Sequence, residues 1–106
     1  MIKTMFLLPE QDNSGVDWED DKLSALETVL LDAFGGYTVD GLVHGAWRSP
    51  YGKEMRDSCI RYVVALDSIA KLSAWVDLIH DVLVDFDQQA IYVEVAGIPE
   101  IINRRK

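Results

Sequence analysis

The chain has 106 residues, of which 49% are hydrophobic and 26% are charged, and its formal net charge at pH 7 is −8. This length and composition favour one small globular domain over residues 1–106 and exclude a disordered chain. The negative charge argues against direct binding of nucleic acid, which needs clustered lysine and arginine. No run of 18 apolar residues exists, so no membrane span is expected.

The single cysteine, Cys59, cannot form an internal disulfide, so the composition indicates no oxidising compartment. Residues 1–12 hold too short an apolar run for a signal peptide, and no small-residue cleavage site follows. We therefore expect a cytoplasmic protein. The one basic run is the tail, Arg104-Arg105-Lys106, which we interpret as a solubility feature.

The chain begins with a predicted strand at residues 2–8, a short apolar run that ends at a proline. A helix is predicted over residues 17–34, where leucines recur at helical spacing. Asp17 is suited to cap its N-terminus, and the acids of its first turn suit the helix dipole. Gly35 follows it and is suited to the left-handed conformation that ends a helix.

The middle of the chain predicts a β-hairpin. Residues 37–48 form one strand, in which Gly41 and Gly45 point to a bulge or a close packing contact. Residues 49–53 form the connecting loop, and residues 54–66 form the clearest strand of the chain. Its apolar residues alternate on one face, at Ile60, Tyr62, Val64 and Leu66.

The last third predicts a helix over residues 67–87, capped by Asp67 and carrying an apolar stripe. A fourth strand follows at residues 89–96, and residues 100–102 add at most a short edge piece. The order β-α-β-β-α-β predicts an α+β, ferredoxin-like fold. Right-handed crossovers place both helices on one face of a four-stranded antiparallel sheet and leave the other face open.

A hairpin that closes around residues 50–53 is expected to pair Trp47 with Arg56 and to place Trp47 on the core side. Alternation then sends ten residues to the open face. They are Leu42, His44, Ala46, Arg48, Asp57, Cys59, Arg61, Val63, Tyr92 and Glu94. A one-residue bulge would move part of this set to the other face.

This open face has two interpretations. It is either a solvated or self-associating surface, which is common for antiparallel sheets, or a ligand site. In the second case His44 is the candidate acid or base, Arg61 holds a carboxylate or phosphate, and Tyr92 and Glu94 lie beside them. Cys59 opposite His44 also invites a thiolate–imidazole interpretation, although a structural cysteine is the commoner case.

The carboxylates are concentrated in the two predicted helices, which hold 11 of the 18 and only two lysines. The exposed residues that make this acidic face are Asp20, Asp21, Asp77, Asp81 and Asp85. Such a face suits a basic protein partner, although acidic stripes also persist simply because water and salt screen them. His80 beside Asp77 and Asp81 supplies too few ligands for a metal site, so no metal or cofactor is expected.

Part of the chain, residues 34–95, resembles a family of small bacterial proteins of unknown function. The resemblance rests on the strand segment Gly45-Ala46-Trp47-Arg48, the proline/glycine hairpin after it, and Phe86 and Gln88 before the last strand. It implies a ferredoxin-like fold and no catalytic residue.

We therefore predict a non-enzymatic interaction protein, a homodimer, that presents its acidic helices to a basic protein partner, as an accessory or inhibitory protein of a mobile element does. The alternative is a small ligand-binding or enzymatic domain that uses His44, Arg61 and Tyr92 on the open sheet face.

Overall fold

The computed structural model describes residues 1–105. In chain order the elements are β1 (Ile2–Pro9), α1 (Asp20–Phe34), β2 (Thr38–Arg48), β3 (Glu54–Leu66), a 3₁₀ turn (Ile69–Lys71), α2 (Leu72–Asp85), β4 (Ala90–Val95) and β5 (Ile98–Asn103). The predicted α+β class is confirmed. None of the helices within residues 1–105 is long and apolar enough to cross a membrane.

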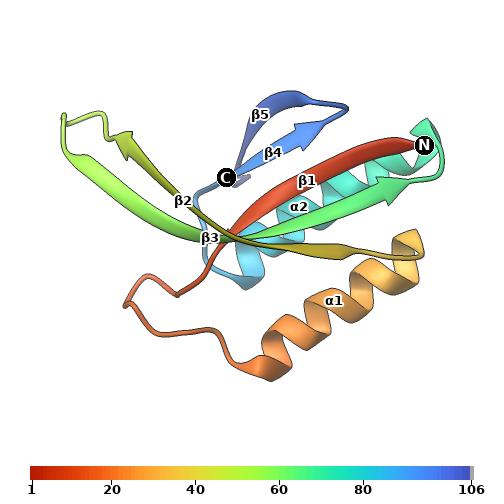
Figure 1. Cartoon of the computed structure of the whole chain (residues 1–106), viewed down its shortest axis with the longest axis horizontal. Helices are drawn as coiled ribbons and strands as arrows, with labels where there is room; N and C mark the ends of the chain where they lie inside the picture. Colours follow the sequence, from red (N-terminus) through yellow and green to blue (C-terminus); the bar gives the residue numbers. More distant parts are fainter. Residues whose placement is uncertain (106) are drawn as a thin grey trace.

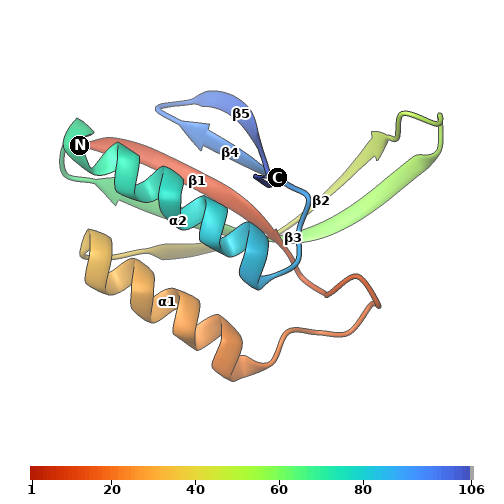
Figure 2. The same cartoon turned by 180° about the vertical axis from the view of Figure 1, so that it is seen from behind.

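The strands form one antiparallel sheet in the order β2-β3-β1-β4-β5. Both helices lie against the same face of this sheet, as expected, and no element within residues 1–105 covers the opposite face (Figures 1 and 2). The predicted number of four strands is wrong, because β5 adds a fifth strand at the edge beside β4.

The fifth strand exists because the chain reverses within two residues. Val95 pairs with Ile98, and the two residues between them, Ala96 and Gly97, have φ values of 52° and 79°. Two consecutive positive φ values are those of the tight hairpin turn whose twist matches that of the flanking strands. Pro99 is tolerated in β5 because this strand lies at the sheet edge.

A β-bulge in β2 sets which side chains share a face. The register between β2 and β3 shifts between Val39 and Leu42, and Gly41 there has a φ of 90°. Beyond the bulge Trp47 pairs with Met55, not with Arg56 as predicted. A one-residue slip moves every side chain to the other face of a strand, so the predicted faces of residues 42–48 are wrong.

The core lies between the sheet and the two helices. Tyr62 of β3 is 1% exposed and stacks on Phe6 of β1, with ring centroids 5.1 Å apart. The Tyr62 hydroxyl donates a hydrogen bond of 2.8 Å to Glu27 Oε2 of α1. The other fully buried side chains include Leu8, Leu30, Val64, Leu66, Trp75, Ile79, Val82, Leu83 and Val93. The predicted apolar faces of β3 and of both helices therefore make one core.

The helices are shorter than predicted at their N-termini. Asp17 does not cap α1, since the helix begins at Asp20 and Asp17 instead forms an isolated bridge with Gln11. Asp67 does not cap the second helix, which starts with the 3₁₀ turn and reaches Asp85. The predicted end of α1 is confirmed, because Gly35 has a φ of 82° and its N–H bonds to Leu31 O.

Candidate functional site

Beyond the end of β1, strands β2 and β3 continue as a two-stranded arm, defined here as residues 44–57. Pairing between β1 and β3 ends at Pro9 and Cys59, so the strand segments of the arm pair only with each other. In both views the arm projects away from the helices and the other strands (Figures 1 and 2).

The predicted ligand residue His44 is not on the open face. The register pairs it with Ser58, whose neighbours Ile60 and Tyr62 define the helix side of β3. The bulge at Gly41 is the physical reason, and it moves Leu42, Ala46 and Arg48 to the same side. His44 is therefore separated from Arg61 by the sheet, and the predicted combination of these two residues is wrong.

The other three predicted ligand residues do share the open face. Tyr92 donates a hydrogen bond of 3.0 Å to Glu94 Oε2, which raises the pKa of Tyr92, while nearby Arg61 opposes that rise. Arg61 Nε lies 3.6 Å from Asp40 Oδ2. That Nε atom is buried and has no hydrogen-bond partner among residues 1–105. Arg61, Tyr92 and Glu94 thus form a polar cluster, with one unused donor.

The bulge also brings Trp47 to the open face of the arm. Its side chain is 51% exposed, and its Nε1–H donates a 2.8 Å hydrogen bond to Asp57 Oδ2. Cys59 pairs with Val43 rather than with His44. Burial, and then the charge of Asp57, raise the pKa of the Cys59 thiol, so the thiolate–imidazole interpretation is not supported.

A second polar region lies at the end of the sheet where the arm begins. There His44 pairs with Ser58, and the Glu10 N–H bonds to Ser58 O at 2.9 Å. At the same end of the sheet, the N–H of Arg104, just after β5, donates to the O of Gln89, just before β4, at 2.8 Å. Backbone pairing therefore gathers polar residues from distant parts of the chain at one sheet end.

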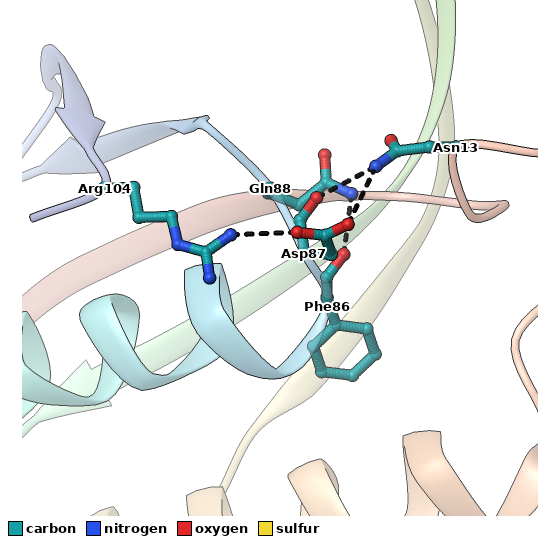
Figure 3. Close-up of polar contacts among 5 residues, drawn as sticks. All are labelled: Asn13, Phe86, Asp87, Gln88 and Arg104. Carbon is teal, nitrogen blue, oxygen red and sulfur yellow. Dashed lines mark hydrogen bonds and ion pairs between the residues drawn. The ribbon is translucent and has the colours of Figure 1, made fainter. Parts of the chain in front are cut away.

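At this end a junction of four residues, Asn13, Asp87, Gln88 and Arg104, joins three segments of the chain (Figure 3). Arg104 Nη1 donates to Asp87 Oδ1 at 2.9 Å. Asn13 Nδ2 donates to Asp87 O at 3.1 Å and lies 3.4 Å from Asp87 Oδ2. The Gln88 side-chain amide donates to Phe86 O at 2.9 Å. We call this set the Asp87 junction.

The backbone of Asp87 is in the left-handed region, with a φ of 50°. This conformation costs a residue other than glycine of the order of 1 kcal/mol or more, and such residues cluster at functional sites. The Asp87 side chain, with its carboxylate, is 75% exposed to solvent, whereas the Arg104 side chain is 31% exposed. The junction therefore presents an accessible carboxylate that is held in place by a partly buried cation.

The predicted acidic face divides into different environments. Asp77 lies 3.6 Å from Arg105 Nη2, and Asp20 and Asp21 occupy the first turn of α1. Asp81 and Asp85 line a groove of about 320 Å³ between the two helices. The other groove residues are Lys22, Ala25, Leu26, Val29, Leu78, Val82 and Phe86. We call this feature the inter-helix groove.

Within residues 1–105, no three His, Cys, Asp or Glu side chains are grouped so that they could hold a metal ion. His80 is half-buried, and its Nδ1 atom has no hydrogen-bond partner in the described part of the chain.

The Asp87 junction was not predicted from the sequence, because Asp87 was expected to lie inside the second helix. One signal was available. Many helices end with one residue in the left-handed conformation, and where no glycine follows the helix, aspartate and asparagine adopt that conformation more readily than most residues. No comparable local signal predicts that Asn13 and Arg104 contact Asp87. They lie 74 and 17 residues from Asp87 in the sequence and meet it only in the folded chain.

No family model matches the chain, and no curated protein matches it. Two similar solved structures are those of a phage SAM lyase. The structure of the complex with S-methyl-5′-thioadenosine has 13% sequence identity and a TM-score of 0.66, and the match covers 96% of this chain and 88% of the other. The structure of the apo state has 12% identity and a TM-score of 0.66, and the match covers 99% and 90%.

At this identity the likeness shows that the fold is shared over nearly the whole chain. The protein whose fold is shared is an enzyme that acts on a small molecule. This finding contradicts the prediction of a non-enzymatic interaction protein built on the acidic helices, and it favours the predicted alternative of a ligand-binding or enzymatic domain. The physical reason for the error is that a carboxylate-rich helix face needs no partner when water and salt screen it.

Proposed function

We propose that this protein is an enzyme that cleaves S-adenosylmethionine and releases S-methyl-5′-thioadenosine, and that it holds the amino-acid end of the substrate at the Asp87 junction. The observation that carries the proposal is the fold likeness to a phage SAM lyase over 96–99% of this chain. That likeness concerns the backbone, so a site can be identified only from this chain's own residues.

The Asp87 junction has charges that complement an amino acid. The methionine part of the substrate carries an ammonium group and a carboxylate on the same carbon. Asp87 and Arg104 form an ion pair in which the acceptor is open to solvent. An amino-acid group can take the place of this pair, with its ammonium on Asp87 and its carboxylate on Arg104, so that each charge keeps a partner.

The proposed reaction requires little proton transfer by the protein. When the bond from sulfur to the four-carbon chain breaks, the sulfur keeps the electron pair and becomes a neutral thioether. As that bond breaks, the substrate's own carboxylate bonds to the same carbon from the side opposite the sulfur, closing a lactone without taking up water or moving a proton. The protein's part is to hold the carboxylate in line with the breaking bond, which is catalysis by positioning.

The test is to incubate the purified full-length chain with S-adenosylmethionine and to measure S-methyl-5′-thioadenosine by liquid chromatography and mass spectrometry. In water enriched in ¹⁸O, the four-carbon product should carry no label when it is first formed. Asp87→Asn should lower kcat/KM by about 10- to 100-fold, the equivalent of about 1.5–3 kcal/mol for a hydrogen bond to a charged group. Arg104→Gln should act mainly by raising KM.

Two matched variants serve as controls. Asp32→Asn removes an exposed carboxylate elsewhere on α1, and Arg105→Gln removes the neighbouring arginine of the tail; both should retain wild-type kinetics. No thioadenosine product from the wild type would overturn the proposed reaction. Product formation that Asp87→Asn leaves unchanged would overturn the proposed site.

A second candidate site is the open-face cluster of Arg61, Tyr92 and Glu94. Its specific support is the buried Arg61 Nε atom, which has no hydrogen-bond partner among residues 1–105. If the substrate binds there, Arg61→Gln rather than Arg104→Gln raises KM in the same assay.

Two finer points belong to the proposal. We take the first four strands, in the order β2-β3-β1-β4, as a ferredoxin-like sheet to which β5 is an addition. We also take the protein to act in the cytoplasm, in keeping with its single free cysteine.

A further inference from the structure

The helix side of the arm carries an open groove. On this side of β2 and β3, His44 pairs with Ser58 and Ala46 pairs with Arg56. The arm projects away from both helices, so neither of them covers this face (Figures 1 and 2). The groove has a volume of about 490 Å³, which is within the ordinary range of small-molecule sites. It is lined by His44, Gly45, Ala46, Arg56, Asp57 and Ser58, and we call it the arm groove.

The floor of the arm groove is low, and planar groups stand on two of its sides. Gly45 has no side chain and Ala46 has only a methyl group. His44 and Arg56 are diagonal neighbours across the strand pair, and such neighbours lie about 7–8 Å apart. A flat ring in van der Waals contact with a planar group on each face needs about 7 Å between those groups. The spacing therefore suits an aromatic heterocycle stacked between the imidazole and the guanidinium.

Ser58 supplies an unused polar group to the arm groove. Its Oγ atom is buried and has no hydrogen-bond partner among residues 1–105, while its backbone O accepts a 2.9 Å bond from the Glu10 N–H. An unpaired buried hydroxyl is unfavourable, and a serine side chain turns between three staggered positions. A ligand that carries hydroxyl groups gives Ser58 the partner that it lacks.

The arm groove is close to the Asp87 junction. Asn13, which donates to Asp87 O, lies three residues along the chain from Glu10. Three residues span at most about 11 Å, and Glu10 is hydrogen-bonded to Ser58 in the groove. In S-adenosylmethionine, the α-carbon lies about 9 Å from the ribose carbon that carries adenine when the molecule is extended. The spacing of the two places therefore suits one substrate molecule.

We propose that the arm groove holds the nucleoside end of S-adenosylmethionine. Adenine stacks between His44 and Arg56, the ribose hydroxyls bond to Ser58, and the amino-acid end lies at the Asp87 junction. The protein then fixes both ends of the substrate, and the bond that breaks lies between them. This inference rests on the proposed function, since it names the place where the other half of the same substrate binds.

The probe for this site is S-methyl-5′-thioadenosine, which keeps the nucleoside and lacks the amino-acid end. Its dissociation constant is measured with the full chain by isothermal titration calorimetry. Ala46→Phe, which fills the floor of the arm groove, should raise this constant by about tenfold or more. His44→Ala, which removes one stacking surface, should raise it by about fivefold or more.

Two controls make the test specific to the arm groove. Ala74→Phe places the same ring at an exposed position of α2 and should leave the dissociation constant of the probe unchanged. Asp87→Asn should also leave it unchanged, because the probe has no amino-acid group for the junction. In the cleavage assay the probe should compete with S-adenosylmethionine, and Ala46→Phe should raise its inhibition constant by the same factor.

Ala46 and His44 are exposed, and circular dichroism checks that both variants fold. A probe that does not bind the wild type at millimolar concentration would overturn the nucleoside site, and so would binding that both variants leave unchanged. The cleavage assay separates this failure from failure of the proposed reaction. Cleavage by a protein whose groove variants bind the probe normally refutes the site and keeps the reaction. Probe binding in the groove without any cleavage refutes the reaction and keeps the site.

Discussion

Replacement of Tyr62 by phenylalanine tests how α1 is held on the sheet. Tyr62 is buried, and its hydroxyl donates to Glu27 Oε2 at 2.8 Å. Tyr37 donates to the other oxygen of Glu27 at 3.3 Å. A hydrogen bond to a charged group contributes about 1.5–3 kcal/mol. Glu27 is half-buried and keeps its hydrogen bond from Tyr37 in the variant. We therefore expect Tyr62→Phe to lower the free energy of unfolding by about 1.5 kcal/mol near pH 7.

The same contact predicts a pH dependence with a definite sign. Burial, and then the hydrogen bond to Glu27, raise the pKa of Tyr62 well above its ordinary value of 10.0. A raised pKa means that the stabilisation is fully present below the pKa of the unfolded chain and is lost as pH rises above it. Above pH 10 the wild type should therefore lose about 1.4 kcal/mol per pH unit that Tyr62→Phe does not lose.

The assay is urea unfolding of wild type and Tyr62→Phe between pH 7 and pH 11.5, followed by tryptophan fluorescence. The stability difference between the two should be constant to about pH 9.5 and should shrink toward zero near pH 11. Glu27→Gln, alone and combined with Tyr62→Phe, completes a double-mutant cycle that isolates the contact. A difference that stays the same at pH 7 and pH 11 would refute the reasoning.

Two further predictions concern packing and the backbone. Leu30→Ala removes a fully buried side chain of α1 and should lower the free energy of unfolding, measured in urea, by about 2–5 kcal/mol. Leu31→Ala, at a position 53% exposed, should change it little. Equal effects of the two variants would mean that α1 is not packed as described. Ala96→Gly should raise the unfolding free energy by about 0.5–1 kcal/mol, because it relieves a left-handed residue in the β4–β5 turn; a destabilised variant would contradict that turn.

The apolar patterns predicted the layers of this fold correctly. The alternation of Ile60, Tyr62, Val64 and Leu66 identified the core face of β3, and the stripes of both helices identified the faces that cover it. These patterns are reliable because burial of apolar surface dominates the free energy of folding. They contain no information on turns, so the reversal at Ala96 and Gly97, and with it β5, was missed.

The site depended on features that periodicity does not reveal. One extra residue at Gly41 moved His44 away from Arg61 and brought Trp47 to the open face. A prediction from alternation is therefore correct on β3 and wrong on β2 beyond the bulge. The Asp87 junction depends on long-range pairing, since Asn13 and Arg104 reach Asp87 only after the sheet has formed.

The most direct test of the proposed site is an amide ¹⁵N NMR titration of the full chain with S-adenosylmethionine. We predict that the largest shifts occur at Asn13, Asp87, Gln88 and Arg104, and that Arg104→Gln weakens the binding that these shifts report. Shifts confined to Arg61 and Tyr92 on the open face, or no shifts at saturating ligand, would contradict the proposal that the Asp87 junction holds the substrate.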